Sequence, residues 1–265
     1  MVIWMNTLKL INLTVSIEGN IILNNFNLKI NSGEIHVLMG PNGVGKSTLT
    51  KVIMGDPNYK IESGSIYYND VLLNDLPVDE RARMGIFLGM QLPPEIEGVT
   101  NADFLRTAVS NKEKEKFKLL EFINSIDSTV SKLDMDSTMV HRDVNKGFSG
   151  GERKKNEILQ MYVLKPSMIM LDEIDSGLDV DSLKTVGEAV MDYFKTNNPG
   201  ILLITHYDRL LDYIKPTHVH VLKNGSIVKS GDYSLVSEIE KHGFNENKKI
   251  DSTGVCAVRK NLDNE

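Results

Sequence analysis

A glycine-rich stretch of this sequence has the residue types and the spacing that bind a chain of phosphates. The segment GPNGVGKST, residues 40–48, fits the pattern G-x-x-x-x-G-K-[ST] and directly follows the apolar run EIHVLM. Glycines let backbone N–H groups turn toward phosphate oxygens, and the helix that follows offers its positive N-terminus. In this pattern Lys46 reaches the terminal phosphates and Ser47 holds Mg²⁺. The sequence therefore predicts a nucleotide site between a buried strand and a helix.

Five carboxylates within ten positions form a second feature that suggests chemistry. In MIMLDEIDSGLDVD, residues 168–181, four apolar residues run directly into Asp172 and Glu173. A strand that ends in Asp172 can bring this carboxylate to the Mg²⁺ beside the phosphates, and Glu173 can orient or deprotonate an attacking water. One nucleotide site does not explain the other three carboxylates, and each of them could instead cap a helix or stabilise its first turn. These three residues are Asp175, Asp179 and Asp181. We favour this structural interpretation for Asp181.

The stretch GFSGGERKKNEILQM, residues 147–161, predicts a second anion site. Ser149, Gly150 and Gly151 open a helix whose first N–H groups have no partner within the helix itself. Since one phosphate chain already has its own loop, a second cradle is explained if two copies meet head to tail. The Ser-Gly-Gly segment of one copy then closes over the γ-phosphate bound by the other, and two-fold symmetry gives two composite sites.

The elements that must position these residues can be read from apolar runs that alternate with helical patterns. The runs cover residues 8–17, 35–39, 86–90, 168–171, 201–205 and 218–222. This alternation predicts an α/β fold with a largely parallel sheet covered by helices. Near the C-terminal end, Asn224 and Gly225 lie between two alternating runs and predict a hairpin.

The segment 101–144 lacks strong strand runs, and we expect it to form a helical subdomain inserted between strands of the sheet. Within it, residues 112–118 are interpreted as a solvated helix face. The polar residues beyond about 245 predict a frayed tail. We therefore expect one domain over residues 1–245, with the helical subdomain at about 92–150, and a polar tail over 246–265.

Composition limits the class of protein. With 265 residues, 41% hydrophobic and 25% charged, the chain is typical of a soluble globular protein. A net charge of -6 argues against binding to nucleic acid or to an anionic membrane surface. The single cysteine, Cys256, cannot form an internal disulfide, which fits a reducing compartment. No apolar run approaches the roughly 20 residues that span a bilayer, and no secretory signal is recognised at the start. We expect a soluble, intracellular protein.

With these motifs in this order, residues 6–243 resemble the nucleotide-binding domain of an ABC-type ATPase. The resemblance implies a P-loop ABC-ATPase fold with a mostly parallel core sheet, an antiparallel β part and an inserted helical subdomain. It implies Walker A at residues 40–48, the signature at 148–152, Walker B at 168–172 and the D-loop at 176–179.

The resemblance also implies the residues of the site. Those expected to be catalytic are Glu173, His206 in LLITHYDRLLDYI and Gln91 in FLGMQLP, where His206 contacts the γ-phosphate and water and Gln91 is the Q-loop residue. The expected Mg²⁺ ligands are Ser47, Gln91 and Asp172. The residues expected to bind ATP, including one at the subunit contact, are Gly40, Pro41, Asn42, Gly43, Val44, Gly45, Lys46, Ser47, Thr48, Ser149, Gly150, Gly151 and Asp179.

Departures from the common family pattern point to one branch. Most members read D-E-P-T-S-A-L-D where this chain reads DEIDSGLD, and the strings GGERKKNEILQM and THYDRLLDYIKPTHVHVLKNGSIVKSGD continue the departure. These strings resemble the SufC family, which comprises the ATPase subunits of the SUF iron-sulfur cluster assembly machinery. This resemblance implies ATP and Mg²⁺ as cofactors, a SufB-SufD-type scaffold as partner, and ATP-driven dimerisation that remodels the scaffold. It implies a cytoplasmic location, or a plastid stroma or other organelle matrix. The alternatives are the ATPase of a membrane transporter and a non-enzymatic nucleotide switch.

The adenine side of the site lacks the aromatic residue that many ABC ATPases have there. Val15, Ile17 and Ile22 are candidates for apolar contacts with the base, and their alternative is strand core. Phe26 is expected to face the core.

Two further expectations concern coupling. Residues 91–108 are expected to dock the partner through Ile96 and Val99, with a simple linker as the alternative. In the free subunit, Lys154 is expected to pair with Glu173 and hold it away from water, with a solvated basic helix face as the alternative.

Overall fold

Buried strands form the centre of the fold in the computed structural model, which describes residues 6–113, 117–205 and 208–244. The strands are β1 Thr7–Ile17, β2 Asn20–Asn31, β3 Ile35–Met39, β4 Lys60–Tyr68, β5 Val71–Leu72, β6 Ile86–Gly89, β7 Ile96–Thr100, β8 Asp143–Val144, β9 Met168–Asp172, β10 Gly200–Ile204, β11 His218–Lys223 and β12 Ser226–Gly231. The helices are α1 Lys46–Met54, α2 Val78–Arg83, α3 Asn101–Glu113, α4 Leu119–Lys132, the short 3-10 helix η2 Ser137–His141, α5 Gly150–Leu164, α6 Val180–Asn197, α7 Asp208–Tyr213 and α8 Ser234–His242.

The central sheet has the strand order β12-β11-β3-β10-β9-β6. Its neighbours pair in parallel except for the hairpin of β11 and β12. Every residue of β3, β9 and β10 is buried, as expected for parallel strands covered on both faces. Asn224 and Gly225 both have positive φ angles, 50° and 75°, which suits a tight hairpin turn. The predicted parallel sheet and the predicted hairpin are confirmed.

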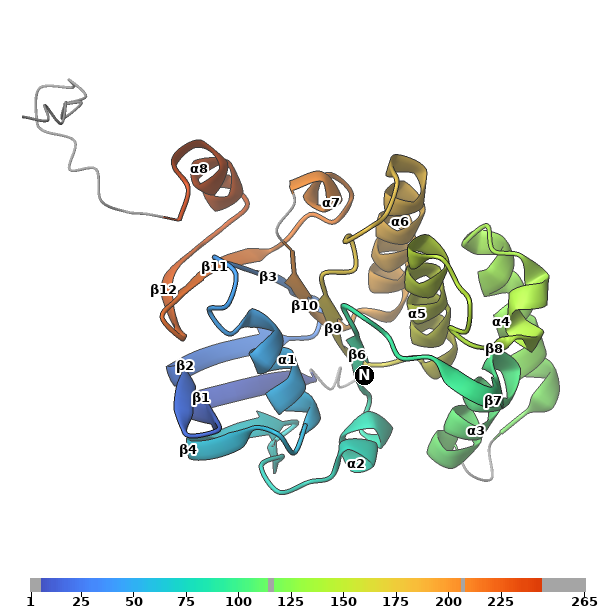
Figure 1. The fold of residues 1–265 in the computed structure, drawn as a ribbon, viewed down its shortest axis with the longest axis horizontal. Coiled ribbons are helices and arrows are strands. Elements are labelled where there is room, and N and C mark those ends of the chain that lie inside the picture. The colour runs from blue at the N-terminus through green and yellow to red at the C-terminus, as the bar shows by residue number, and fades with distance from the viewer. Residues whose placement is uncertain (1–5, 114–116, 206–207, 245–265) are drawn as a thin grey trace, which may run out of the picture.

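A second, antiparallel sheet of order β2-β1-β4-β5 lies beside the first (Figure 1). Its inner side and α1 share one apolar core with the central sheet, which includes Phe26, Leu49, Ile66 and Met170. Phe26 is fully buried there, as predicted. The other face of the central sheet is covered by apolar residues of α5, α6, α7 and α8. The predicted combination of a parallel core and an antiparallel part is therefore confirmed.

Between β6 and α5 the chain forms α3, α4 and η2, at the end of the molecule opposite β1, β2 and β4 (Figure 1). In the described part of residues 101–144 the one strand is the two-residue β8, which pairs with β7 through Ile96 and Val144 and agrees with the expected lack of strong strand runs. Of the expected solvated face of residues 112–118, Lys118 is exposed as predicted, whereas the prediction is wrong for Lys112. Lys112 Nζ donates to the carbonyls of Leu164, at 2.6 Å, and of Lys165, and so caps the C-terminal end of α5.

Two further expectations concern a membrane span and the C-terminal tail. No helix among the described residues is long and apolar enough to cross a membrane. The predicted polar tail over residues 246–265 lies outside the described residues.

Candidate nucleotide-binding site

The glycine-rich loop joins the C-terminal end of β3 to α1, and its backbone conformation depends on glycine. Gly43 and Gly45 have φ angles of 79° and 103°, in the left-handed region that residues with a Cβ atom rarely adopt. Gly45 is the N-cap of α1, which has no hydrogen bond from a capping side chain and no acidic residue in its first turn. The positive end of this helix is therefore open to an anion, as a phosphate site requires.

Lys46 is buried within this loop. Its Nζ donates to the carbonyl oxygens of Gly40 at 2.8 Å and Pro41 at 2.9 Å. Burial lowers the pKa of Lys46, whereas the nearby charges of Glu173 and Asp172 raise it. Because charge-assisted hydrogen bonds to phosphate are stronger than bonds to neutral carbonyls, the ammonium group can exchange one set of partners for the other.

Ser47 and Asp172 are 125 residues apart in sequence and meet where α1 begins and β9 ends. Ser47 Oγ donates to Asp172 Oδ1 at 3.0 Å. Burial raises the pKa of Asp172, the hydrogen bond from Ser47 lowers it, and the charge of Glu173 raises it further. A hydroxyl and a carboxylate at this spacing are the oxygen ligands that Mg²⁺ prefers, so the two residues fit the predicted ion.

Glu173 follows β9 in a left-handed backbone conformation, with a φ angle of 48°. Its N–H donates to the carbonyl of Ile204 at 2.9 Å, which ties it to the neighbouring strand β10. Its Oε2 accepts a hydrogen bond from Gln91 Nε2. The residue predicted to act on water and the predicted Q-loop residue are therefore in direct contact.

Lys154 does not pair with Glu173, and the expected restraint by this lysine is corrected. The Lys154 side chain is buried, and its Nζ donates to the carbonyls of Met90 at 2.8 Å and Gln91 at 2.7 Å. These two carbonyls satisfy the ammonium group at the packed side of α5, so a solvated position is also wrong for this residue. Lys154 fixes the backbone of Gln91, whose side chain in turn holds Glu173.

Glu157, one turn further along α5 than Lys154, also binds the backbone of Met90. Its Oε2 accepts a hydrogen bond from the Met90 N–H at 2.6 Å. Burial raises the pKa of Glu157 to about 7, although the Met90 N–H and the charge of Lys154 oppose the shift. Sequence reasoning missed this residue, although an acid three positions after a lysine on a helix lies on the same face.

Two more contacts attach the following residues to the start of α5 and the loop before it. Asn145 Nδ2 donates to the carbonyl of Pro94 at 2.9 Å. Arg153 donates to the carbonyl of Phe148 at 3.0 Å and forms an ion pair with Glu95. The segment 90–95 is thus attached to the signature region at its beginning and at its end.

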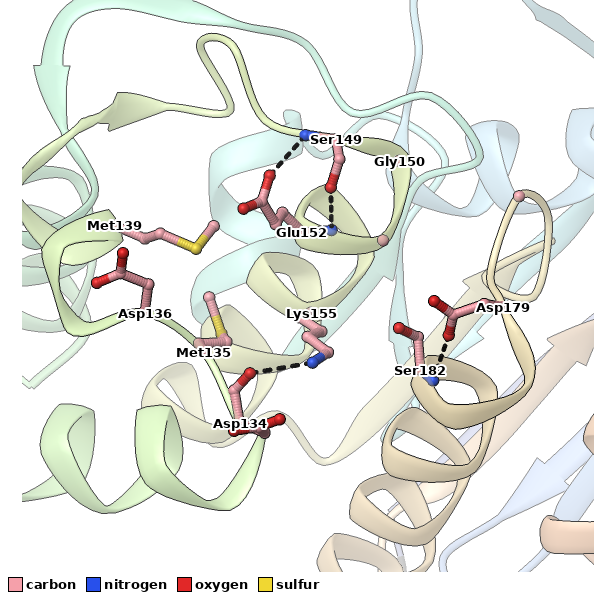
Figure 2. A pocket seen from close by; sticks show the side chains of 12 residues that line it. Asp134, Met135, Asp136, Met139, Ser149, Gly150, Glu152, Lys155, Asp179 and Ser182 are labelled. Atoms are coloured by element: carbon pink, nitrogen blue, oxygen red, sulfur yellow. Dashed lines mark hydrogen bonds between the residues drawn. The ribbon is translucent and has the colours of Figure 1, made fainter.

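The signature region lines a pocket of about 460 Å³ together with the predicted D-loop. Figure 2 shows Ser149 and Glu152 at the start of α5 and Asp179 and Ser182 at the start of α6 on neighbouring sides of this pocket. Ser149 is the N-cap of α5 and forms a reciprocal capping box with Glu152. Two N–H groups of the predicted anion site are therefore used inside the helix start, while Gly150 and Gly151 line the pocket.

The remaining aspartates of the 168–181 stretch have structural positions at or before the start of α6. Asp179 is the N-cap of α6, and the Ser182 N–H that it accepts at 2.7 Å lowers its pKa. Asp181 lies in the first turn of α6, as favoured from the sequence. Asp175 is buried and accepts a hydrogen bond from Thr205 Oγ1 at 2.5 Å.

The other predicted site residues are only partly placed. His206 lies outside the described residues. Of the candidates for base contact, Val15 is fully buried as strand core, whereas Ile17 and Ile22 are half-buried. Only the last two keep a surface that a base could contact.

A groove of about 840 Å³ runs from the site between α1, α2, β6 and α3. Ser47, Gln91 and Asp172 line its inner end, and apolar side chains such as Phe104 form much of the rest. Leu92, in its lining, is 85% exposed. Residues near both ends of the predicted docking segment 91–108 therefore line the groove. Ile96 and Val99, in the middle of the segment, belong to β7 and are not part of this lining.

Known proteins are similar to this chain in sequence and in fold. The profile of the ABC transporter family matches residues 23–176. A probable ABC transporter ATP-binding protein of Streptococcus pyogenes serotype M3 is 49% identical over 242 residues, which cover 91% of this chain and 94% of that protein. A probable ATP-dependent transporter ycf16 of Antithamnion sp. is 49% identical, covering 88% of this chain and 94% of that one.

The fold is also shared with solved structures. The dimeric post-hydrolysis structure of the ATP-binding cassette MJ0796 bound to ADP and Pi has a TM-score of 0.73 at 21% identity, over 85% of this chain and 98% of that chain. Fold and site together define a P-loop ATPase. The chain belongs to the ABC transporter family and forms an ATP-binding and ATP-hydrolysing domain of that family.

Proposed function

We propose that this chain is the ATP-hydrolysing subunit of an iron-sulfur cluster assembly scaffold complex. Two copies close head to tail on a SufB-SufD-type scaffold when ATP binds, and this closure remodels the scaffold during cluster assembly. The protein then acts in the cytoplasm, or in a plastid stroma or other organelle matrix. The resemblance of DEIDSGLD and the strings around it to the SUF ATPase subunits supports this branch of the family.

The hydrolytic part of the proposal depends on one observation, the convergence of Ser47, Gln91, Asp172 and Glu173 beside the glycine-rich loop. Lys46 and the N-terminus of α1 bind the phosphates. Glu173 orients the attacking water and accepts its proton as the water oxygen bonds to the γ-phosphorus, and ADP leaves with the electrons of the broken P–O bond. Gln91 positions Glu173 in the free subunit.

Ser47 and Asp172 are the proposed Mg²⁺ ligands, with the side-chain oxygen of Gln91 as a third. When bound, the ion neutralises charge on the phosphate oxygens. The residues of this chain hold those oxygens in place.

The second cradle needs a second copy. Ser149, Gly150, Gly151 and Asp179 line the same pocket, which is distinct from the lining around Ser47 and Asp172. A phosphate chain bound at the glycine-rich loop of one copy can therefore be covered by the signature pocket of another, which gives the composite site.

The partner part of the proposal rests on the groove. Its lining is mostly apolar, it includes the strongly exposed Leu92, and it reaches Gln91 and Asp172 at its inner end. An exposed apolar groove of this kind is suited to a protein partner. A partner seated there touches the segment that holds Glu173, so nucleotide state and partner position can influence each other.

A membrane transporter ATPase is the second candidate, and it is favoured by the names of the relatives, a probable ABC transporter ATP-binding protein and a probable ATP-dependent transporter. Co-purification from the native cell, followed by identification of the bound chains, separates the two functions. Soluble SufB-type or SufD-type chains are expected. Recovery of a membrane permease in their place contradicts the assembly role and leaves the ATPase intact.

A further inference from the structure

Three potential metal ligands lie together at the end of the central sheet that is remote from the glycine-rich loop. One ligand atom each of Glu34, His36 and His218 lies within 4.8 Å of the others. His36 is directly opposite His218 in the parallel pairing of β3 with β11. Since the glycine-rich loop begins four residues after His36 on the same strand, the cluster is roughly 13 Å from it.

From this geometry we propose that Glu34, His36 and His218 form a binding site for a divalent transition-metal ion of the Zn²⁺ class. Two imidazoles and one carboxylate are a ligand set that Zn²⁺ uses, with water as the fourth ligand. Mg²⁺ prefers oxygen ligands, so this site and the Ser47–Asp172 site differ in the ion that they take.

Glu34 and His36 are already held close together. His36 Nε2 lies 3.1 Å from Glu34 Oε2, a spacing that tetrahedral Zn²⁺ spans with bonds of about 2.1 Å. The Glu34 carboxylate is fixed by hydrogen bonds from the backbone and side chain of Asn31, at 2.7 and 2.9 Å. Little ordering is therefore needed for these two ligands.

Hydrogen bonds behind His36 allow it to present a free lone pair to a metal. His36 Nδ1 lies 2.9 Å from His220 Nε2, and His220 Nδ1 lies 2.8 Å from Ser230 Oγ. If the protons along these hydrogen bonds shift together, His36 Nδ1–H donates to His220 Nε2, and His220 Nδ1–H donates to Ser230 Oγ. His36 Nε2 is then unprotonated, as a metal ligand requires, and its ring is oriented by a second hydrogen bond.

His218 has a comparable support. The Thr217 hydroxyl donates to the Ile35 carbonyl and accepts from the Ile35 N–H, so its 2.9 Å contact with His218 Nδ1 fits an Nδ1–H donor. The lone pair of His218 is then on Nε2. His218 stacks on His36 with ring centroids 4.3 Å apart, and it is exposed. A shift of roughly 1 to 1.5 Å of this exposed ring closes the site to tetrahedral spacing.

The test is calorimetric titration of the nucleotide-free, tag-free protein with ZnCl₂. We expect one Zn²⁺ per chain at this site and a loss of affinity of at least about tenfold in both His218→Ala and Glu34→Gln. His242→Ala, which removes an exposed histidine from α8, is the matched control and should bind like the wild type. Titration with Co²⁺ adds a second readout, since a site of two imidazoles and a carboxylate gives visible d–d bands without thiolate charge transfer.

Several outcomes would overturn the assignment: a wild-type chain that binds no Zn²⁺, equal affinity in all variants, or a loss in only one of the two site variants. Thermal unfolding without metal shows whether the variants are folded. MgATP binding, measured separately, should be unchanged in both, because the site lies at the far end of β3. A failure here therefore leaves the proposed ATPase role untouched.

Discussion

Gln91 Nε2 donates a hydrogen bond to Glu173 Oε2, so the Q-loop residue holds the carboxylate that is proposed to act on water. The backbone of Gln91 is in turn fixed by Lys154 of the signature helix. If α5 moves when its N-terminus meets a second copy, as proposed, two hydrogen bonds connect that movement to Glu173. This chain of contacts replaces the direct pairing of Lys154 with Glu173 that the sequence suggested.

The composite site predicts opposite behaviour for two variants. Lys46→Ala should abolish tight ATP binding, because the phosphates lose their buried cation. Glu173→Gln should keep ATP binding and lower kcat by roughly 10² to 10⁴, trapping an ATP-bound dimer because closure precedes chemistry. A titration with ATP measures nucleotide binding by both variants, and light scattering with MgATP and scaffold measures the dimer. If Glu173→Gln stays monomeric at high protein concentration, the head-to-tail arrangement is wrong.

Removal of the Lys154 ammonium should uncouple the signature helix from Gln91. In Lys154→Met we expect unchanged ATP affinity but a smaller stimulation of the ATPase by the scaffold, since the carbonyls of Met90 and Gln91 lose their common donor. Lys241→Met is the control, because Lys241 is an exposed lysine of α8 that lines neither the signature pocket nor the groove. Equal stimulation of both variants and the wild type would exclude a coupling role for Lys154.

Burial of Glu157 predicts a pH dependence of stability. The folded protein holds this proton up to about pH 7, whereas an unfolded chain releases it near the ordinary value of 4.5. The stabilising contribution is therefore fully present below about pH 4.5 and is lost as the pH rises through about 7. This shift corresponds to at most roughly 3 kcal/mol.

Glu157→Gln tests this dependence, because the amide oxygen can still accept the Met90 N–H but carries no proton to lose. Urea unfolding across this pH range should give a flatter dependence in the variant than in the wild type. Parallel curves for the two proteins would show that Glu157 does not titrate there.

The groove predicts which apolar residues bind the partner. Leu92→Asp should weaken scaffold binding by about tenfold or more, because it places a charge in the apolar contact. Ile96→Asp and Val99→Asp, on β7 beside the groove, test the docking surface expected from sequence, and both should also weaken binding. ATP affinity should remain unchanged in all three. Normal scaffold binding in Leu92→Asp with a loss in the β7 variants would move the contact from the groove to β7.

The sequence by itself determined the local parts of this protein. The apolar run, the glycines and Lys46 of residues 35–48 encode strand, loop and helix in one continuous stretch, because backbone freedom and hydrophobic period act over a few residues. The buried strand that ends in Asp172 and the helix start at Ser149 could be predicted for the same reason.

Only the tertiary structure decided which side chains meet. Ser47 finds Asp172 across 125 positions because β9 lies two strands from β3 in the sheet. His36 meets His220 across 184 positions because β11 pairs with β3. Lys154 looked free to reach Glu173, but on the packed side of α5 the carbonyls of Met90 and Gln91 are its nearest acceptors. A buried ammonium group takes the acceptors that packing brings to it, and no local pattern encodes that choice.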